Sequence, residues 1–236
     1  QCPSFIVNYG VSPHHLSSKV FLGIVEWLRT TRLDAKHNGR KLEADALKIV
    51  INRIYGALND AMDYLYDPEC TYTVTINLQL LLCNLIESFE LNGFDVLSAN
   101  TDGLLIRRPN DRLDLFNHIC KEWEDYSKLS LDTEVFEKYC RSAVNDYIAV
   151  GYGFYDALQE YNRCGVWIDS KGNTYTTRQA IEDKFIKFKG YFLQDPEYNK
   201  GFVYPVVKKA LKEYFLYGVD TVSYTHLRAH ETGRNL

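Results

Sequence analysis

Apolar residues recur along much of this chain with the spacing of an amphipathic α-helix. One such stripe consists of Phe21, Ile24, Val25 and Leu28, and a second consists of Leu47, Val50, Ile51, Ile54 and Leu58. Between them, residues 36–40 read Lys-His-Asn-Gly-Arg, which is typical of a turn. The pattern therefore predicts two antiparallel helices joined by a tight connection.

A third helical stripe precedes a predicted β-hairpin. The stripe consists of Leu78, Leu81, Leu82, Leu85, Ile86 and Phe89, and it ends near Asn92-Gly93. Two short β-prone runs follow within residues 95–107 and meet at the polar turn Asn100-Thr101-Asp102-Gly103. This arrangement puts a carboxylate, Asp102, at the tip of the hairpin, although an aspartate in a turn most often serves only the turn itself.

The second helix also carries a polar face. Lys48, Asn52 and Tyr55 fall within about 60° of one another on a helical projection, beside the apolar stripe. This arrangement lets one side of the helix be buried while the other meets a ligand, but a solvated surface helix would show the same spacing.

Three motifs in order give the chain a resemblance to the family B DNA polymerases, of the kind common in phages and other viruses. The family's Lys-x-x-x-Asn-Ser-x-Tyr-Gly signature is met at Lys48, Asn52, Tyr55 and Gly56, with Arg53 in place of the serine. Its Asp-Thr-Asp signature is met at Thr101 and Asp102, with Asn100 in place of the first aspartate. Of the signature Asp-x-x-Ser-Leu-Tyr-Pro-Ser, only Pro3 and Ser4 remain. The resemblance extends from Pro3 to about Asp220.

The resemblance implies an α+β fold, in which a polymerase palm of antiparallel strands and helices is interrupted by a two-helix fingers insertion. The expected divisions are palm at residues 1–16, fingers at 17–60, palm at 61–185 and the start of a helical thumb at 186–221. The short distance from Ser4 to Lys48 leaves little room for the insertion of protein-primed members, which favours ordinary primer use.

The resemblance also implies the chemistry of template-directed DNA synthesis. Two Mg²⁺ ions would clamp the attacking and leaving oxygens of nucleotidyl transfer, with Asp102 as one metal ligand. The second carboxylate is expected four residues before Gln1, so residues 1–236 alone are not expected to polymerise. Cys2 stands where the family has the tyrosine that excludes a ribose 2′-hydroxyl, which indicates either altered sugar selection or damaged sequence at Gln1-Cys2.

The incoming dNTP is expected on the two helices of the fingers. Arg32 and Lys36 match an Arg-x-x-x-Lys pair on the family's first fingers helix. Together with Lys48, which we also expect to act in catalysis, they would cradle a triphosphate of about four negative charges. Asn52 and Tyr55 complete the expected nucleotide site. The same three cations would also suit the solvated basic end of a helical hairpin.

Primer–template DNA is the second expected partner. Tyr55 and Gly56 would meet the minor-groove side of the new base pair, where acceptors are placed alike in all correct pairs. Tyr147 matches the tyrosine of the family's Lys-x-Tyr motif, whereas Asn145 replaces its lysine. Lys187 and Lys189 alternate with aromatic residues in 184–191, as in strands that follow a phosphate backbone or in any half-exposed strand.

Composition adds bounds to these expectations. The 236 residues are 46% hydrophobic and 14% aromatic, enough for a sizeable core, and no apolar run of about 20 residues indicates a membrane span. A net charge of −4 argues mildly against a protein that binds nucleic acid over its whole surface. Six cysteines without a Cys-x-x-Cys pair fit a reducing cytoplasm, that of the host if the source is a virus.

The tail at 222–236 is set apart, because Val222–Thr232 looks like a translated sequencing-library adapter. Two alternatives to the DNA polymerase hypothesis remain open. An RNA-templated polymerase also carries carboxylates on a hairpin tip, although the fingers signature argues against it. A non-catalytic DNA-binding relative would account for Asn100 and Cys2. The sequence names no clamp, primase or other replication partner.

Overall fold

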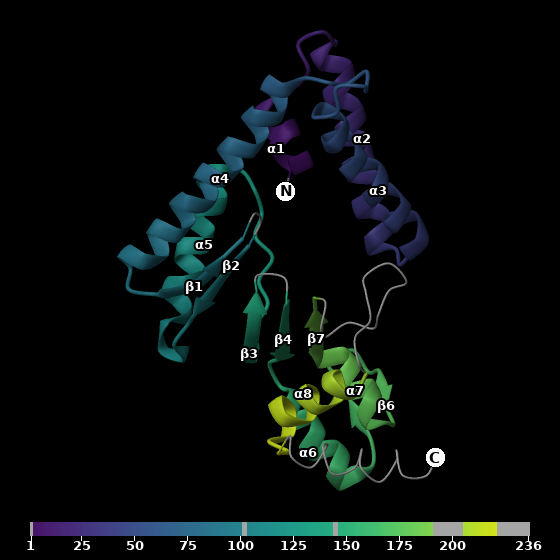
Figure 1. Cartoon of the computed structure of the whole chain (residues 1–236), viewed down its shortest axis with the longest axis vertical. Coiled ribbons are helices and arrows are strands. Elements are labelled where there is room, and N and C mark those ends of the chain that lie inside the picture. The colour runs from purple at the N-terminus through teal and green to yellow at the C-terminus, as the bar shows by residue number, and fades with distance from the viewer. Residues whose placement is uncertain (1, 101–102, 144–145, 191–204, 221–236) are drawn as a thin grey trace, which may run out of the picture. The chain divides into compact units, whose positions relative to one another are not determined.

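The structure is a computed structural model that describes residues 2–100, 103–143, 146–190 and 205–220 (Figure 1). Helices predominate and the strands form small antiparallel sheets, which confirms the predicted α+β class. The chain divides into two compact units, residues 1–132 and 133–236. Each unit is described by itself below.

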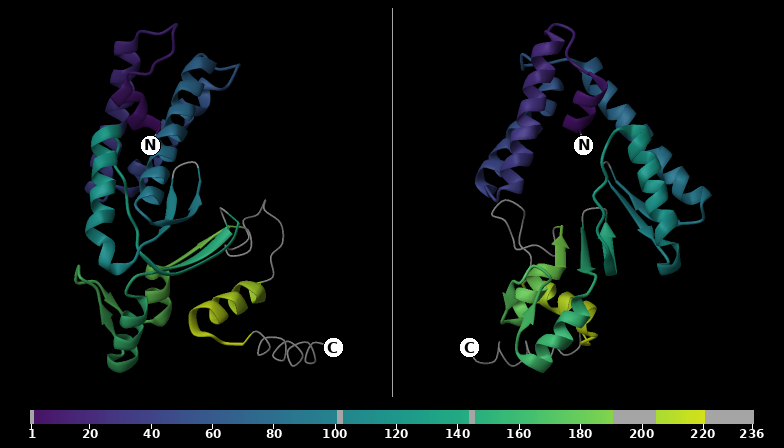
Figure 2. Two further views of the ribbon diagram at one scale, coloured as in Figure 1. Left: turned by 90° about the vertical axis from the view of Figure 1, so that its left-hand side faces the viewer. Right: turned by 180° about the vertical axis from the view of Figure 1, so that it is seen from behind.

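Unit 1 is built from five α-helices, one 3₁₀ turn and one hairpin within its described residues. In chain order these are α1 (Cys2–Tyr9), α2 (Ser18–His37), α3 (Lys41–Leu58), α4 (Pro68–Leu91), β1 (Asp95–Ala99), β2 (Leu104–Arg107), η1 (Asn110–Arg112) and α5 (Leu113–Ser127). Figure 2 shows α2 and α3 as a helical pair. The sequence predicted both helices and the turn between them.

The core of unit 1 is formed by residues from α1, α2, α3, α4 and α5. Its fully buried members include Phe5, Val25, Leu58, Val74 and Phe89. The predicted stripes supply Phe21, Val25, Leu58, Leu85 and Phe89 of this core. Ile24 and Val50 are 51% and 46% exposed, because each helix buries a narrower arc than its stripe covers. The stripes therefore predicted the helices correctly and overstated how much of each is buried.

Helix α4 begins ten residues before its predicted stripe. Asp67 caps it by accepting a hydrogen bond from the Cys70 backbone N–H at 2.9 Å, and Pro68 opens its first turn. Contrary to the expectation from sequence, α4 is long and apolar enough to cross a membrane by length and composition. This is weak evidence, because α4 contributes Val74, Leu85 and Phe89 to the core of unit 1.

The predicted β-hairpin is present. Strands β1 and β2 pair antiparallel from Asp95 opposite Arg107 to Ala99 opposite Leu104. The Asn100 N–H donates to the Gly103 carbonyl at 3.0 Å and closes the turn. Thr101 and Asp102 lie outside the described residues, so the position of the Asp102 carboxylate stays a prediction.

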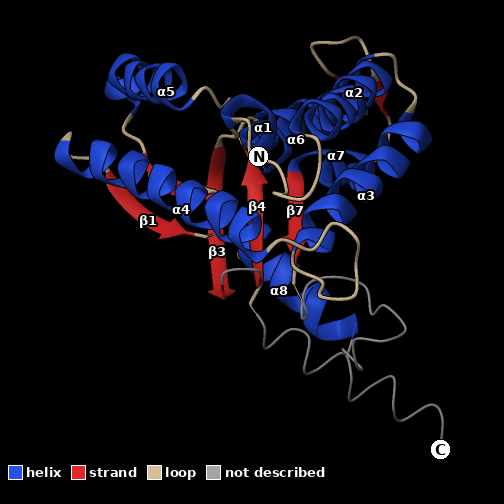
Figure 3. Ribbon diagram, turned by 90° about the horizontal axis from the view of Figure 1, so that it is seen from above, coloured by secondary structure: helices blue, strands red, loops and turns tan. Residues whose placement is uncertain are grey.

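Unit 2 combines a three-stranded sheet with helices that cover one of its faces. Its elements are β3 (Phe136–Ala143), β4 (Asp146–Gly151), α6 (Phe154–Cys164), β5 (Trp167–Ile168), β6 (Thr174–Tyr175), α7 (Arg178–Phe185), β7 (Ile186–Lys189) and α8 (Pro205–Tyr217). The sheet order is β3-β4-β7, visible side by side in Figure 3. Its core contains Ile148, Val150, Phe154, Ile181, Ile186 and Leu216.

The strand expected at 184–191 is shorter than predicted. Helix α7, capped by the Thr177 hydroxyl, extends through Phe185 because Ile181 on that helix packs into the core. The strand is confined to residues 186–189, where it pairs with β4. Residues 186–189 are therefore not the helical segment expected at the start of the thumb, and the next described helix begins at Pro205. The other subdomain boundaries stay predictions.

Candidate functional site

The α2–α3 pair is closed by a short turn that fixes its register. Gly39 adopts a positive φ of 70°, and the Arg40 N–H donates to the Ala35 carbonyl at 2.9 Å. Buried residues on the two helices then form pairs, in which both members are the same number of residues from the turn. These pairs are Ala35 and Ala44, Leu28 and Ile51, and Phe21 and Leu58. By the same count, Arg32 on α2 lies level with Leu47 on α3, and Lys48 is the next residue along that helix.

Arg32 is half-buried because it shares the helical face of Phe21, Val25 and Leu28. Its Nε is buried and has no hydrogen-bond partner, the one such side-chain atom within the described ranges. A buried donor left unpaired costs about 1–3 kcal/mol, so the Nε of Arg32 calls for an explanation such as a catalytic role or a bound ion or water.

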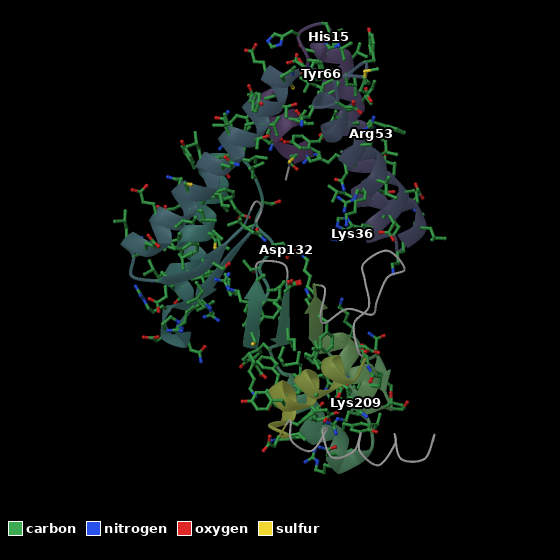
Figure 4. The ribbon with its side chains drawn as sticks, in the orientation of Figure 1. His15, Lys36, Arg53, Tyr66, Asp132 and Lys209 are labelled. Atoms are coloured by element: carbon green, nitrogen blue, oxygen red, sulfur yellow. The ribbon has the colours of Figure 1, made fainter. Side chains whose placement is uncertain are left out.

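Lys36 follows Arg32 by one turn of α2 and is exposed, as is Lys48 on α3. Figure 4 shows Lys36 near the turn end of the helical pair. Two exposed ammonium groups and a half-buried guanidinium thus occupy neighbouring turns of two packed helices. This arrangement suits an anion with several charges, because a guanidinium binds phosphate oxygens in pairs and ammonium groups bind them as point charges.

The polar face of α3 is only partly open. Asn52 is exposed, whereas Tyr55 is half-buried and its hydroxyl shares a 2.6 Å hydrogen bond with the Thr75 hydroxyl on α4. Gly56 is exposed, and an added Cβ would meet no atom within 4 Å. Packing within the described residues therefore does not require glycine at position 56, which leaves room on this face for a ligand.

Arg53, the residue that replaces the signature serine, has a structural partner set that the sequence did not reveal. Its guanidinium donates to Asp63 at 2.8 Å and reaches Asp60 at 3.3 Å. Both acids lie in the connection between α3 and α4, so Arg53 anchors that connection to the end of α3. At the far side of this connection, the His15 imidazole bonds the Tyr64 carbonyl at 2.8 Å (Figure 4).

Asp67 also organises this end of unit 1. Its carboxylate accepts hydrogen bonds from the Cys70 N–H, the His14 N–H and the His14 imidazole, at 2.8–2.9 Å. Burial alone would raise the pKa of Asp67, but these bonds outweigh burial and lower that pKa to about 2. The bond to Asp67 in turn raises the pKa of His14. These groups hold the connection between α1 and α2 against the start of α4.

The metal site expected at Asp102 falls outside the described residues. Among residues 2–100, 103–143, 146–190 and 205–220, no group of three or more His, Cys, Asp or Glu side chains could hold a metal ion. The nearest acid along β1, Asp95, pairs with Arg107 at 3.4 Å. The two-metal chemistry therefore stays a prediction that depends on Asp102.

In unit 2, the expected DNA-binding residues share one face of the sheet. Tyr147 lies opposite Lys189, whose ammonium is 5.9 Å from the tyrosine ring centroid. Lys187, one row along, forms an ion pair with Glu134. The sequence did not single out Tyr139 and Arg141, which belong to the same face through β3. The period-two spacing of Tyr139 and Arg141 was the available signal.

The structure thus groups the predicted residues into two sets. Arg32, Lys36, Lys48, Asn52 and Tyr55 belong to the α2–α3 pair of unit 1. Tyr147, Lys187 and Lys189 belong to the sheet of unit 2. The roles of both sets stay predictions.

Comparisons with known proteins bear on these sets. No protein-family model matches the chain. The chain is 29% identical over 75 residues to DNA polymerase II of Escherichia coli (strain K12), a match that covers 32% of this chain and a tenth of that protein's length. A structure of the family B DNA polymerase from the hyperthermophilic archaeon Pyrobaculum calidifontis aligns with 64% of this chain and 24% of its own, with 17% identity and a TM-score of 0.47.

The sequence match and the polymerase motifs are two kinds of similarity to DNA polymerases. The first is a stretch of aligned residues, and the second includes the spaced residues Lys48, Asn52, Tyr55 and Gly56, which lie on α3. Together they show that part of the chain is similar to part of a family B DNA polymerase.

Proposed function

We propose that this protein takes part in template-directed DNA synthesis, as the part of a polymerase that binds the incoming dNTP and the primer–template. The reaction would transfer a nucleotidyl group from the dNTP to the primer 3′-hydroxyl and release pyrophosphate. The observation that carries this proposal is the buried Nε of Arg32, which has no hydrogen-bond partner among the described residues. Arg32 lies within one residue of the level of Lys48, on a helical pair that bears the family's nucleotide-binding signature.

In this proposal the α2–α3 pair binds the triphosphate. Arg32 would donate to phosphate oxygens and Lys36 would add a second charge one helical turn away. Lys48 would neutralise charge that builds up on the leaving pyrophosphate, and is therefore its candidate catalytic residue. Asn52 and Tyr55, on the same face of α3, would contact the nucleotide, with Tyr55 and Gly56 beside the new base pair.

The proposed metal chemistry involves Mg²⁺, which prefers carboxylate oxygens. Asp102 would be one ligand, and two bound ions would stabilise both the attacking and the leaving oxygen. We further propose that residues 1–236 alone do not extend a primer, because the family's second metal-binding aspartate belongs upstream of Gln1. Template-dependent extension by the purified chain would contradict that part of the proposal.

Nucleotide binding tests the proposal without requiring catalysis. A fluorescent dATP analogue would be titrated into the chain with Mg²⁺ present, and Kd measured for the wild type, Arg32→Gln and Lys48→Gln. We expect each substitution to weaken binding about tenfold or more, the effect of a lost charge-assisted hydrogen bond. Lys19→Gln is the matched control, because Lys19 is an exposed cation at the opposite end of α2.

The outcome separates two interpretations of the helical pair. If all three variants bind the analogue as the wild type does, the cations of α2 and α3 form only a solvated basic end and the proposal fails. If Arg32→Gln and Lys48→Gln alone weaken binding, the nucleotide site is supported.

A second candidate function is non-catalytic DNA binding by a polymerase relative, which the departures Asn100 and Cys2 favour. The test uses a longer protein from the source gene that includes the residues upstream of Gln1. Mg²⁺-dependent primer extension that is lost on Asp102→Asn would exclude the non-catalytic alternative. Duplex binding without extension, unchanged by Asp102→Asn, would favour it.

A further inference from the structure

The Tyr55 hydroxyl stands at the end of a line of threonine hydroxyls along one side of α4. Thr71 and Thr75 are about one helical turn apart on that helix. The Thr71 hydroxyl donates to the Asp67 carbonyl at 3.2 Å, and the Thr75 hydroxyl donates to the Thr71 carbonyl at 2.7 Å. Each threonine thus bonds the carbonyl four residues before it. The Thr75 oxygen also lies 2.6 Å from the Tyr55 hydroxyl on α3.

A count of protons gives the direction of the bond between Tyr55 and Thr75. A threonine hydroxyl has one proton, and the Thr75 proton is used by the Thr71 carbonyl, which can only accept. The Thr75 oxygen must therefore accept, and the Tyr55 hydroxyl donates to it. The opposite direction would leave the Thr75 and Thr71 oxygens 2.7 Å apart without a proton between them. The single hydroxyl proton of Tyr55 is thus used within the protein.

The role proposed for Tyr55 requires the same proton. The minor-groove edge of a base pair presents acceptors, such as N3 of adenine and O2 of thymine. A side chain that bonds one of these acceptors must donate, and a tyrosine hydroxyl has one proton to donate. Tyr55 can therefore bond Thr75 or a base pair, but it cannot bond both at once.

Tyr55 lies at the boundary between the core of unit 1 and the open face of α3. Its ring packs against that core and is half-buried. Asn52 and Gly56 beside it are exposed, and a Cβ added at position 56 would meet no atom within 4 Å. The bond to Thr75 therefore determines that the hydroxyl is directed toward α4 rather than toward the open face.

We propose that Thr75 is a positioning residue, which holds the Tyr55 hydroxyl until a correctly placed minor-groove acceptor replaces it. A correct base pair exchanges one hydrogen bond of Tyr55 for another. A mispair displaces the acceptors, so a hydroxyl that left Thr75 would stay unpaired, which is unfavourable. Thr75 itself touches neither nucleotide nor metal. The inference rests on the proposed function and adds to it a residue that sets base-pair selectivity.

The test compares nucleotide binding opposite a correct and an incorrect template base. The full chain would be mixed with a primer–template hairpin that ends in a dideoxynucleotide. The fluorescent dATP analogue would then be titrated in with Mg²⁺ present, opposite template thymine or template cytosine. Thr75→Val keeps the shape of the side chain and removes the acceptor. We expect it to tighten binding opposite thymine about fivefold, the equivalent of one net hydrogen bond, and to leave binding opposite cytosine unchanged.

Three further variants separate this role from a merely structural one. Thr75→Ser keeps the hydroxyl and should bind the analogue as the wild type does. Thr73→Val alters a threonine about 200° away around α4, and it should also match the wild type. In a Tyr55→Phe background, Thr75→Val should not change binding opposite thymine, because no phenolic proton remains to be released. Circular dichroism of each variant checks that the fold is retained.

The possible failures are distinguishable. If Thr75→Val leaves binding opposite thymine unchanged, weakens binding opposite both bases alike, or acts equally in the Tyr55→Phe background, the inference is overturned while the proposed function stands. If the wild type binds the analogue equally opposite both bases, Tyr55 does not read the base pair and the inference fails, whereas the triphosphate site stands. If the wild type binds no analogue with or without the hairpin, the proposed function fails and the inference fails with it.

Discussion

The buried Glu182 of unit 2 and the half-buried Arg32 of unit 1 differ in how fully their polar atoms are paired. Glu182 in unit 2 is 5% exposed and is met by Arg178, Lys212 and the Tyr217 hydroxyl. Arg32 keeps a buried Nε without any partner. Fully paired buried charges hold a fold together, whereas an orphaned donor destabilises it. The contrast separates a structural charge network from the site at which we propose that an anion binds.

The strongest test of this comparison is to remove Glu182, the carboxylate shared by the paired charges of unit 2. Burial alone would raise the pKa of Glu182, but hydrogen bonds from Lys212 and Tyr217 and the charge of Arg178 outweigh burial and lower that pKa. Glu182→Ala leaves Lys212 and Arg178 without their shared carboxylate. We expect a loss of about 3 kcal/mol in the free energy of unfolding of unit 2, measured by urea denaturation.

The control for Glu182 is Glu160→Ala on the exposed side of α6, which should change stability by less than about 0.5 kcal/mol. Binding of the dATP analogue should be unchanged in both variants at concentrations of urea where unit 1 remains folded. Equal stability of the two variants would show that the Glu182 network is not structural.

A second prediction concerns acid stability in unit 1. Asp67 has a folded-state pKa of about 2 against an ordinary value of 3.8, so its contribution is present above pH 3.8 and is lost as the pH falls through 2. The size of that contribution is about 2 kcal/mol. His14 has a raised pKa, so its contribution is complete below 6.5 and is lost as the pH rises through the raised value.

Unfolding measured from pH 2 to 9 checks this prediction. Wild-type stability from the Asp67–His14 group should be greatest between about pH 4 and 6.5, and Asp67→Asn should flatten the acid side of the profile. An acid limb that is the same in the wild type and in Asp67→Asn would contradict it.

A third prediction follows from the orphaned Nε. Arg32→Met keeps the aliphatic length of the side chain and removes the unpaired donor, so the free energy of unfolding should stay the same or rise by about 1 kcal/mol. The same variant should lose affinity for the dATP analogue. A large loss of stability would show that Arg32 has a structural partner, and the comparison with Glu182 would then fail.

Sequence patterns predicted helices, turns and the hairpin well where the spacing of apolar residues or the residues of a turn determined the local structure. The α2 and α3 stripes, the turn at residues 36–40 and the β1–β2 hairpin follow from apolar spacing and turn chemistry, and all three are present. Glu182 could not be recognised, because its partners Lys212 and Tyr217 lie far along the chain and meet it only through tertiary packing. The sequence predicted too long a strand at β7. The cap at Thr177 and the packing of Ile181 extend α7 through Phe185, into the segment 184–191 where basic and aromatic residues alternate.

The candidate site shows the same division. The motif spacing predicted that Lys48, Asn52 and Tyr55 share a face, but it could not show that the Tyr55 hydroxyl bonds Thr75 on α4. It also gave no reason for Arg53, whose partners Asp60 and Asp63 are recognisable only once the connection after α3 is folded. The sequence therefore predicted which residues share a face of one helix, but it could not predict contacts between different elements.

Arg53 supplies the smallest expected effect and the finest test of the comparison. It is 60% exposed, and its pairs with Asp60 and Asp63 are surface pairs, which contribute roughly 0.2–1 kcal/mol each. Arg53→Ser, which restores the signature residue, should lower stability by no more than about 1 kcal/mol, and by less at 0.5 M KCl because salt screens exposed pairs. Urea denaturation at two salt concentrations measures this. Because Arg53 is paired, as Glu182 is, the substitution should leave the affinity for the dATP analogue within twofold of the wild type. A tenfold change in affinity would instead make Arg53 part of the nucleotide site. Pairing alone would then no longer separate structural charges from ligand-binding charges.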